Sequence, residues 1–177
     1  MNITVYLGAN NGNERMRQAA EQLGTWIGQN GNQLVYGGSK SGLMGILAEA
    51  ALRAGGKVIG VEPKAFVDDC LQLEGITKLI VTENMTERKA RMIELGDAFI
   101  AFPGGTGTLE EIAEVMSKKA LGQLDGPCFF FNLEGYYNSL RNQLETMISY
   151  GLSSSKRQEG IYFCDTLEDV LAHIEGH

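Results

Sequence analysis

Short runs of apolar residues recur along the chain, separated by longer segments whose apolar positions have helical spacing. Each short run is almost continuously apolar, which is typical of a strand covered on both faces. The runs predict seven strands, at residues 3–7, 33–36, 57–61, 77–81, 98–102, 128–131 and 161–163. The longer segments predict helices at residues 14–29, 43–54, 84–95, 109–120, 137–150 and 167–174.

The alternation of strand and helix predicts an α/β fold in a single domain, residues 1–177. We expect about seven strands in a doubly wound parallel sheet, with helices on both faces and therefore three layers. Residues 62–76 are the least regular segment, and we expect a loop or a short helix there.

The composition excludes several kinds of site. Both histidines, His173 and His177, lie at the end of the chain, so a Ser-His-Asp or Cys-His site or a His-ligated zinc site is not expected, and we predict no metal. The formal net charge of −7 disfavours a nucleic-acid partner. Three widely spaced cysteines are expected to be reduced thiols of a cytoplasmic protein. No segment predicts a signal peptide or a membrane span.

Glycine is abundant, with 23 residues, and many glycines follow predicted strands. In doubly wound sheets ligands bind beyond the carboxyl ends of the strands, and glycine lets the backbone approach a ligand closely. The glycine-rich turns therefore predict a binding site at that edge; their members are Gly8, Gly12, Gly37, Gly38, Gly42, Gly45, Gly104, Gly105 and Gly107.

The most specific motif spans residues 102–111, with the sequence Phe-Pro-Gly-Gly-Thr-Gly-Thr-Leu-Glu-Glu. It leaves a buried strand and opens a helix, so backbone N–H groups and the helix dipole favour a phosphate. It is neither the dinucleotide fingerprint nor a P-loop. For Glu111 an alternative stays open, because Thr108-x-x-Glu111 also fits a purely structural capping box.

The helix predicted at residues 84–95 carries two cations on its apolar side. On a helical wheel Arg88 and Lys89 fall within the arc defined by Met85, Met92, Ile93 and Leu95. A buried cation requires a partner, so these side chains are expected to face an anion or a carboxylate. The alternative is that both stems extend past the core to water.

Two further features are weak by themselves. The segment at residues 36–45, with the sequence Tyr-Gly-Gly-Ser-Lys-Ser-Gly-Leu-Met-Gly, has an ordinary strand–helix loop as its alternative interpretation. Glu74 lies in the irregular segment and would signify nothing as a single exposed glutamate.

Together these motifs resemble the Lonely Guy family of cytokinin-activating phosphoribohydrolases, long mislabelled as lysine decarboxylases. The resemblance rests on the glycines of residues 37–45, on Met85-x-x-Arg88-Lys89 and on residues 103–111, and it extends to about Tyr137. It implies a Rossmann-like fold and hydrolysis of the N-glycosidic bond of nucleoside 5′-monophosphates, such as AMP and N6-substituted AMP. It also implies a homodimer, and no metal or organic cofactor.

The resemblance also implies roles for individual residues. The family's catalytic arginine and glutamate match Arg88 and Glu111. The positions expected to bind substrate are Gly8, Asn10, Gly37, Gly38, Glu74, Met85, Lys89, Gly104, Gly105, Thr106, Gly107, Thr108, Glu110 and Ser117. The chain departs from the family at residues 7–10, where Asn10 replaces a hydroxyl residue, and at residues 118–120, where Lys-Lys-Ala replaces Trp-x-Gln.

These residues suggest a division of labour and leave alternatives. An ionised Glu111 would stabilise an oxocarbenium-like ribose and polarise water, whereas Arg88 would act electrostatically because guanidinium keeps its proton. The group that protonates the leaving base is not identified. The alternative class is a nucleotide-binding or molybdenum-cofactor-binding protein without turnover. A lysine decarboxylase is disfavoured, because pyridoxal enzymes usually need a Schiff-base lysine in a larger scaffold.

Overall fold

The computed structural model describes residues 1–176, and it confirms the predicted alternation of strands and helices. Near-continuous apolar runs form the strands because both of their faces are covered by helices. The strands are β1 (Asn2–Tyr6), β2 (Gln33–Tyr36), β3 (Lys57–Pro63), β4 (Lys78–Thr82), β5 (Ala98–Ala101), β6 (Cys128–Phe131) and β7 (Ile161–Cys164).

The helices are α1 (Glu14–Gln29), α2 (Gly42–Arg53), α3 (Lys64–Asp68), α4 (Met85–Leu95), α5 (Thr106–Ala120), α6 (Asn138–Ser149) and α7 (Leu167–Glu175), together with the 3-10 turns η1 (Leu133–Gly135) and η2 (Ser155–Gln158). Of these, α1, α2, α4, α5 and α7 begin at polar or glycine N-cap residues and bury one apolar side. None of the helices within residues 1–176 combines the length and the apolar character needed to cross a membrane.

Within residues 1–176 the strands form one parallel sheet in the order β4-β3-β2-β1-β5-β6-β7. The chain runs outward from β1 to β4 and then returns to place β5 on the other side of β1. The topological switch point therefore lies between β1 and β5, where doubly wound sheets form their ligand crevice.

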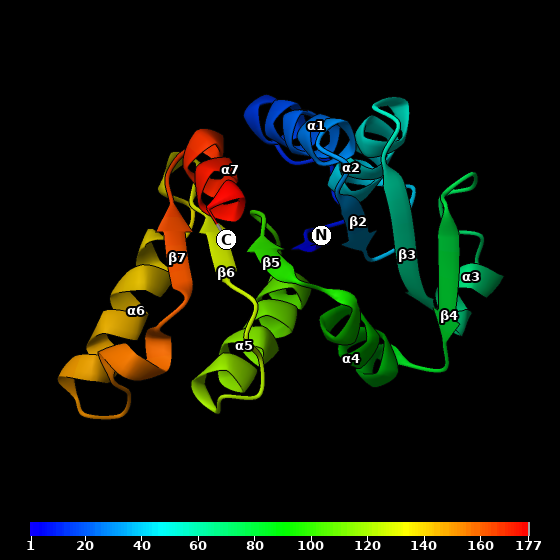
Figure 1. Ribbon diagram of the computed structural model, residues 1–177. Helices are drawn as coiled ribbons and strands as arrows, with labels where there is room; N and C mark the ends of the chain where they lie inside the picture. The colour runs from blue at the N-terminus through cyan, green and yellow to red at the C-terminus, as the bar shows by residue number, and fades with distance from the viewer. Residues whose placement is uncertain (177) are drawn as a thin grey trace.

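The sheet is the middle of three layers (Figure 1). Helices α1, α2 and α7 cover one face, and α4, α5 and α6 cover the other, while α3 lies beyond the β4 edge (Figure 1). Each face has its own apolar core. Leu23, Leu47 and Val170 belong to the first, and Met92, Ile112 and Tyr137 belong to the second. The predicted three-layer, doubly wound α/β fold is confirmed.

Several predicted boundaries were wrong. Strand β3 continues to Pro63, and β4 lies at residues 78–82, whereas α3 confirms the expected short helix within residues 62–76. The largest difference concerns α5, which begins at Thr106 rather than at residue 109. The pattern of apolar residues hides this start, because the first turn of α5 is polar and glycine-rich.

Candidate active site

Glycine-rich turns leave β1, β2 and β5 at the carboxyl edge of the sheet, as the sequence predicts. The turns after β1 and β2 pack directly on each other, because the Leu43 N–H donates to the Asn10 carbonyl at 3.1 Å. A side chain at Gly42, where φ is +55°, would overlap the Ala9 carbonyl. The turn after β5 adjoins the switch point, so the predicted glycine residues surround one edge of the sheet.

Within residues 1–176, no side chain caps the N-terminus of α5. Gly105 is the N-cap residue, so the N–H groups of the first turn remain available to an anion. Thr108 is the third residue of the helix and is buried against Gly104. The capping-box interpretation of Thr108 and Glu111 was therefore wrong, because the helix begins before Thr108 and the Glu111 carboxylate has a different partner.

That partner is Arg88 on α4. Its Nη1 donates to Oε1 of Glu111 at 2.7 Å, and both side chains are 6% exposed. The Arg88 Nε also donates to the Val61 carbonyl at 2.9 Å, which fixes the guanidinium at the end of β3. Burial raises the pKa of Glu111, and Arg88 opposes that shift. The sequence placed both residues in one site, and the structure brings them into direct contact.

Lys89, which is also on α4, faces two carboxylates of α5, the helix that carries Glu111. Its Nζ lies 2.6 Å from Oε1 of Glu110 and 3.4 Å from Oε2 of Glu114. The hydrogen bond with Glu110 raises the pKa of Lys89. The prediction that the cations of α4 face carboxylates is confirmed for Arg88 and Lys89, and the alternative of two stems that extend to water was wrong.

Position 37 requires glycine because the Arg88 side chain lies close to its backbone. A side chain at Gly37 would overlap Nη2 of Arg88, so the turn after β2 lies against the guanidinium. At the neighbouring Gly38 φ is +90°, and a Cβ there would lie 3.0 Å from Oε2 of Glu62. These two glycines therefore allow side chains from β3 and α4 to fill space beside the turn.

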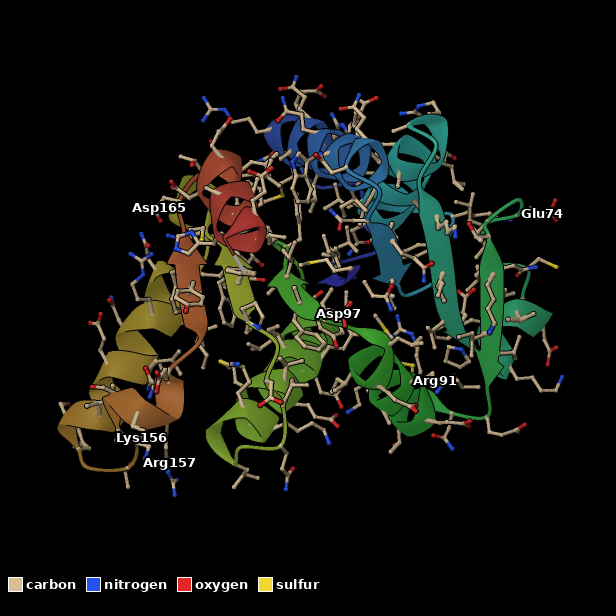
Figure 2. The ribbon with its side chains drawn as sticks, viewed as in Figure 1. Glu74, Arg91, Asp97, Lys156, Arg157 and Asp165 are labelled. Carbon is tan, nitrogen blue, oxygen red and sulfur yellow. The ribbon has the colours of Figure 1, made fainter. Side chains whose placement is uncertain are left out.

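The other predicted substrate-binding residues lie around this cluster with exposed side chains. Asn10 is exposed on the turn after β1, and Met85 is 40% exposed at the first residue of α4. Ser117 is exposed in the fourth turn of α5, away from its N-terminus. Glu74 is exposed on the loop that precedes β4, at the outer edge of the molecule (Figure 2). Within residues 1–176, none of these four side chains forms a hydrogen bond or ion pair with Arg88 or Glu111.

Sequence reasoning missed two buried polar residues at this edge. Tyr6 is the last residue of β1, and Glu62 is the penultimate residue of β3. The Tyr6 hydroxyl and Oε2 of Glu62 are buried with no hydrogen-bond partner within residues 1–176. Burial raises the pKa of both groups, and the nearby Glu111 raises that of Tyr6 further. A polar residue at the carboxyl end of an apolar strand was the signal that could have found them.

A cavity of about 530 Å³ adjoins the turn after β5. Leu109 and Tyr136 contribute to its lining, and the Tyr136 hydroxyl donates to the Gly104 carbonyl. In the described part of the chain, no group of three or more His, Cys, Asp or Glu side chains is placed to hold a metal ion. The chemistry available at this edge therefore comes from carboxyl groups, a guanidinium and backbone amides.

The fold and this edge define a Rossmann-like α/β protein with a backbone anion site beside a buried ion pair. The family model described as "Possible lysine decarboxylase" matches residues 44–174. A cytokinin riboside 5′-monophosphate phosphoribohydrolase of Rhodococcoides fascians is 41% identical over 175 residues, covering 97% of this chain and 88% of the relative. One from Arabidopsis thaliana is 36% identical over 176 residues, covering 99% and 83%. The chain therefore belongs to this family, the Lonely Guy family.

A solved structure with the same fold is the molybdenum cofactor carrier protein of Chlamydomonas reinhardtii. Its TM-score is 0.75 at 20% sequence identity, with 99% of this chain and 96% of that chain covered. A likeness at this level of identity concerns the arrangement of the sheet and helices alone.

Proposed function

We propose that this protein hydrolyses the N-glycosidic bond of nucleoside 5′-monophosphates, releasing the free base and ribose 5-phosphate. The observation that carries the proposal is the buried Arg88–Glu111 pair beside the N-terminus of α5, whose N-cap residue is Gly105. The ion pair supplies a carboxylate that can act at the ribose, and the N-terminus of α5 supplies a site for the phosphate. Cleavage of a nucleotide requires both. The relatives named as cytokinin riboside 5′-monophosphate phosphoribohydrolases support AMP and N6-substituted AMP as substrates.

The N-terminus of α5 is the proposed binding site of the 5′-phosphate. Its free N–H groups and positive dipole end favour a dianion, and Gly104 and Gly105 let the backbone approach it. The full proposed substrate-binding set is Gly8, Asn10, Gly37, Gly38, Glu74, Met85, Lys89, Gly104, Gly105, Thr106, Gly107, Thr108, Glu110 and Ser117. Of these, the residues at the turns after β2 and β5 and at the start of α5 are the ones supported by proximity to the ion pair.

Glu111 is proposed to act on the ribose and on water. Breaking the bond builds positive charge on the ribose ring, which a buried carboxylate stabilises more strongly than water would. The same carboxylate can accept a proton from the attacking water. Arg88 holds Glu111 ionised and oriented through the 2.7 Å hydrogen bond, because its own guanidinium does not lose a proton. Anchoring the phosphate then fixes the bond relative to these groups.

Release of free base tests the proposal. The purified protein is incubated with AMP, N6-isopentenyl-AMP and the other common nucleoside monophosphates, and base and ribose 5-phosphate are separated chromatographically. We expect equal amounts of both products from at least one adenine nucleotide. Intact nucleotide after prolonged incubation would contradict the proposal, and tight nucleotide binding without base release would then favour a carrier function.

We further propose that the protein is a homodimer of single-domain subunits and works in the cytoplasm. The resemblance to the family supports the dimer, and light scattering after gel filtration tests it. The cysteines Cys70, Cys128 and Cys164 are free thiols in the described part of the chain, which supports a reducing compartment. Localisation of a tagged protein in cells tests this assignment.

A further inference from the structure

Glu62 is buried without the partners that a buried carboxylate needs. Glu62 is only 1% exposed, and its Oε2 receives no hydrogen bond from any group within residues 1–176. An ionised carboxylate in such a place is costly, and native proteins rarely leave a buried polar atom unsatisfied without a functional reason. The Arg88–Glu111 pair gives Glu62 no salt bridge, since Arg88 directs its hydrogen bonds to Glu111 and to the Val61 carbonyl.

The surroundings of Glu62 place it in the candidate active site. It follows Val61, whose carbonyl is the acceptor of the Arg88 Nε, so the two side chains meet at the end of β3. On the side of β2, a Cβ at Gly38 would lie 3.0 Å from Oε2 of Glu62. The charged and titratable groups that face Glu62 are Arg88 from α4 and Tyr36 from β2, and Glu111 from α5 stands behind the guanidinium.

The cluster holds two carboxyl groups and one permanent cation. Glu111 receives a charge-assisted hydrogen bond from Arg88, so the negative charge is better stabilised there. Glu62 has no such donor, so nothing offsets the cost of burying its charged form except the nearby charge of Arg88. Burial raises the pKa of Glu62 to about 6, against the opposing effect of Arg88. Arg88 therefore favours the charged form of Glu111, whereas Glu62, which lacks a donor, keeps a proton up to a pH of about 6 and can donate it.

We propose that Glu62 is the general acid that protonates the leaving base. This inference rests on the proposed function, in which cleavage requires a proton on the departing base and Glu111 is needed as a carboxylate. As the C1′–N bond breaks, its electron pair passes to the base, and the base nitrogen takes the proton of Glu62. Water adds to C1′ and gives a proton to Glu111, which passes it to solvent, and Glu62 regains a proton from solvent.

The glycine turn after β2 gives Glu62 access to a bound nucleotide. Its carboxyl group fills the space that a side chain at residue 38 would occupy, and Gly37 and Gly38 are proposed to contact the substrate. Hydrogen bonds of acid catalysts often tighten only in the substrate complex, so a carboxyl group beside this turn is placed to approach a bound base. A polar residue here is otherwise unexpected, because the neighbouring side chains of β3, Val61 and Pro63, are buried and apolar.

Leaving-group dependence tests this assignment. AMP requires protonation of its base, whereas ribose 5-phosphate carrying p-nitrophenolate has a leaving group that departs as a stable anion. The variants are Glu62→Gln, which keeps the shape, and Glu62→Leu, which removes polarity and guards against misfolding. Glu94→Gln serves as the matched control, because Glu94 is an exposed carboxylate on α4 paired with Arg91.

We expect both Glu62 variants to lose about 100-fold or more in rate on AMP, as for a positioned acid, and to retain the wild-type rate with p-nitrophenolate. With the wild-type enzyme the rate on AMP should fall as pH rises above about 6, and Glu62→Gln should lack that limb. Equal losses on both substrates, or no loss on AMP, would overturn the assignment of Glu62. Failure of the wild-type protein to release base would instead overturn the proposed function.

Discussion

Arg88 and Glu111 meet as a buried ion pair, with 2.7 Å between Nη1 and Oε1, although 23 positions separate them in the chain. One comes from α4 and the other from the first turns of α5. The pair therefore ties the two helices together at the carboxyl edge of the sheet, beside the switch point between β1 and β5. A stabilising contact and a proposed catalytic contact are here the same contact.

We expect the stability losses of substitutions at Arg88 and Glu111 to be strongly non-additive. Replacing Arg88 or Glu111 singly, as in Arg88→Met or Glu111→Leu, leaves a buried charge without its partner and should cost about 3–5 kcal/mol. The double variant removes both charges, so its loss should be much smaller than the sum of the two. Urea unfolding of the four proteins measures this. Additive losses would show that the two charges do not depend on each other in the fold.

Catalysis should depend on the charge of Glu111 more than on its shape. Glu111→Gln keeps a hydrogen-bond acceptor for Arg88 but removes the carboxylate, so base release from AMP should fall about 100-fold or more. Glu94→Gln is the control, since this exposed carboxylate on α4 lies outside the proposed site. Steady-state rates on AMP with both variants provide the measurement, and a Glu111→Gln protein with the wild-type kcat would contradict the role.

The raised pKa of Glu62 has a consequence for stability. The ordinary value of 4.5 becomes about 6 on folding, so between these pH values the folded state holds more of the proton than the unfolded state. The free energy of unfolding should therefore fall by about 2 kcal/mol in all as pH rises through both values, from roughly pH 3.5 to roughly pH 7. Glu62→Gln should lack this component. Unfolding curves of both proteins across this range test it, and parallel pH profiles would refute it.

Two adjacent glycines in the turn after β5 should respond differently to alanine. A Cβ at Gly104 would overlap the Thr108 side chain, which is buried, whereas no described atom lies within 4 Å of a Cβ at Gly105. Gly104→Ala should destabilise the protein by about 1–3 kcal/mol, and Gly105→Ala should cost less, since it meets no described atom and loses only the preference for glycine over alanine at the N-cap. Thermal unfolding of the two variants, side by side, is the measurement. The same melting temperature for both would argue against this packing.

The sequence predicted the elements well where apolar periodicity was strong and less well where glycine and polar residues begin a helix. The strand at residues 128–131 is four buried apolar residues, and its bounds were predicted correctly. The start of α5 was placed too late because its first turn carries glycine and threonine rather than apolar side chains. The cations of α4 were predicted to need partners, but a wheel could not name Glu111 or Glu110, since those lie on another helix.

The sequence by itself determined the layered α/β fold, the glycine turns and the need for a partner at Arg88, because each of these follows from local pattern and from the cost of burying a charge. Only the tertiary structure decided which groups meet. Strand order brings the ends of β2 and β3 beside α4, and this places Gly38, Glu62 and Arg88 together. The sequence does not distinguish Glu62 from the other glutamates, and its pKa is raised only because packing removes its water and supplies no donor.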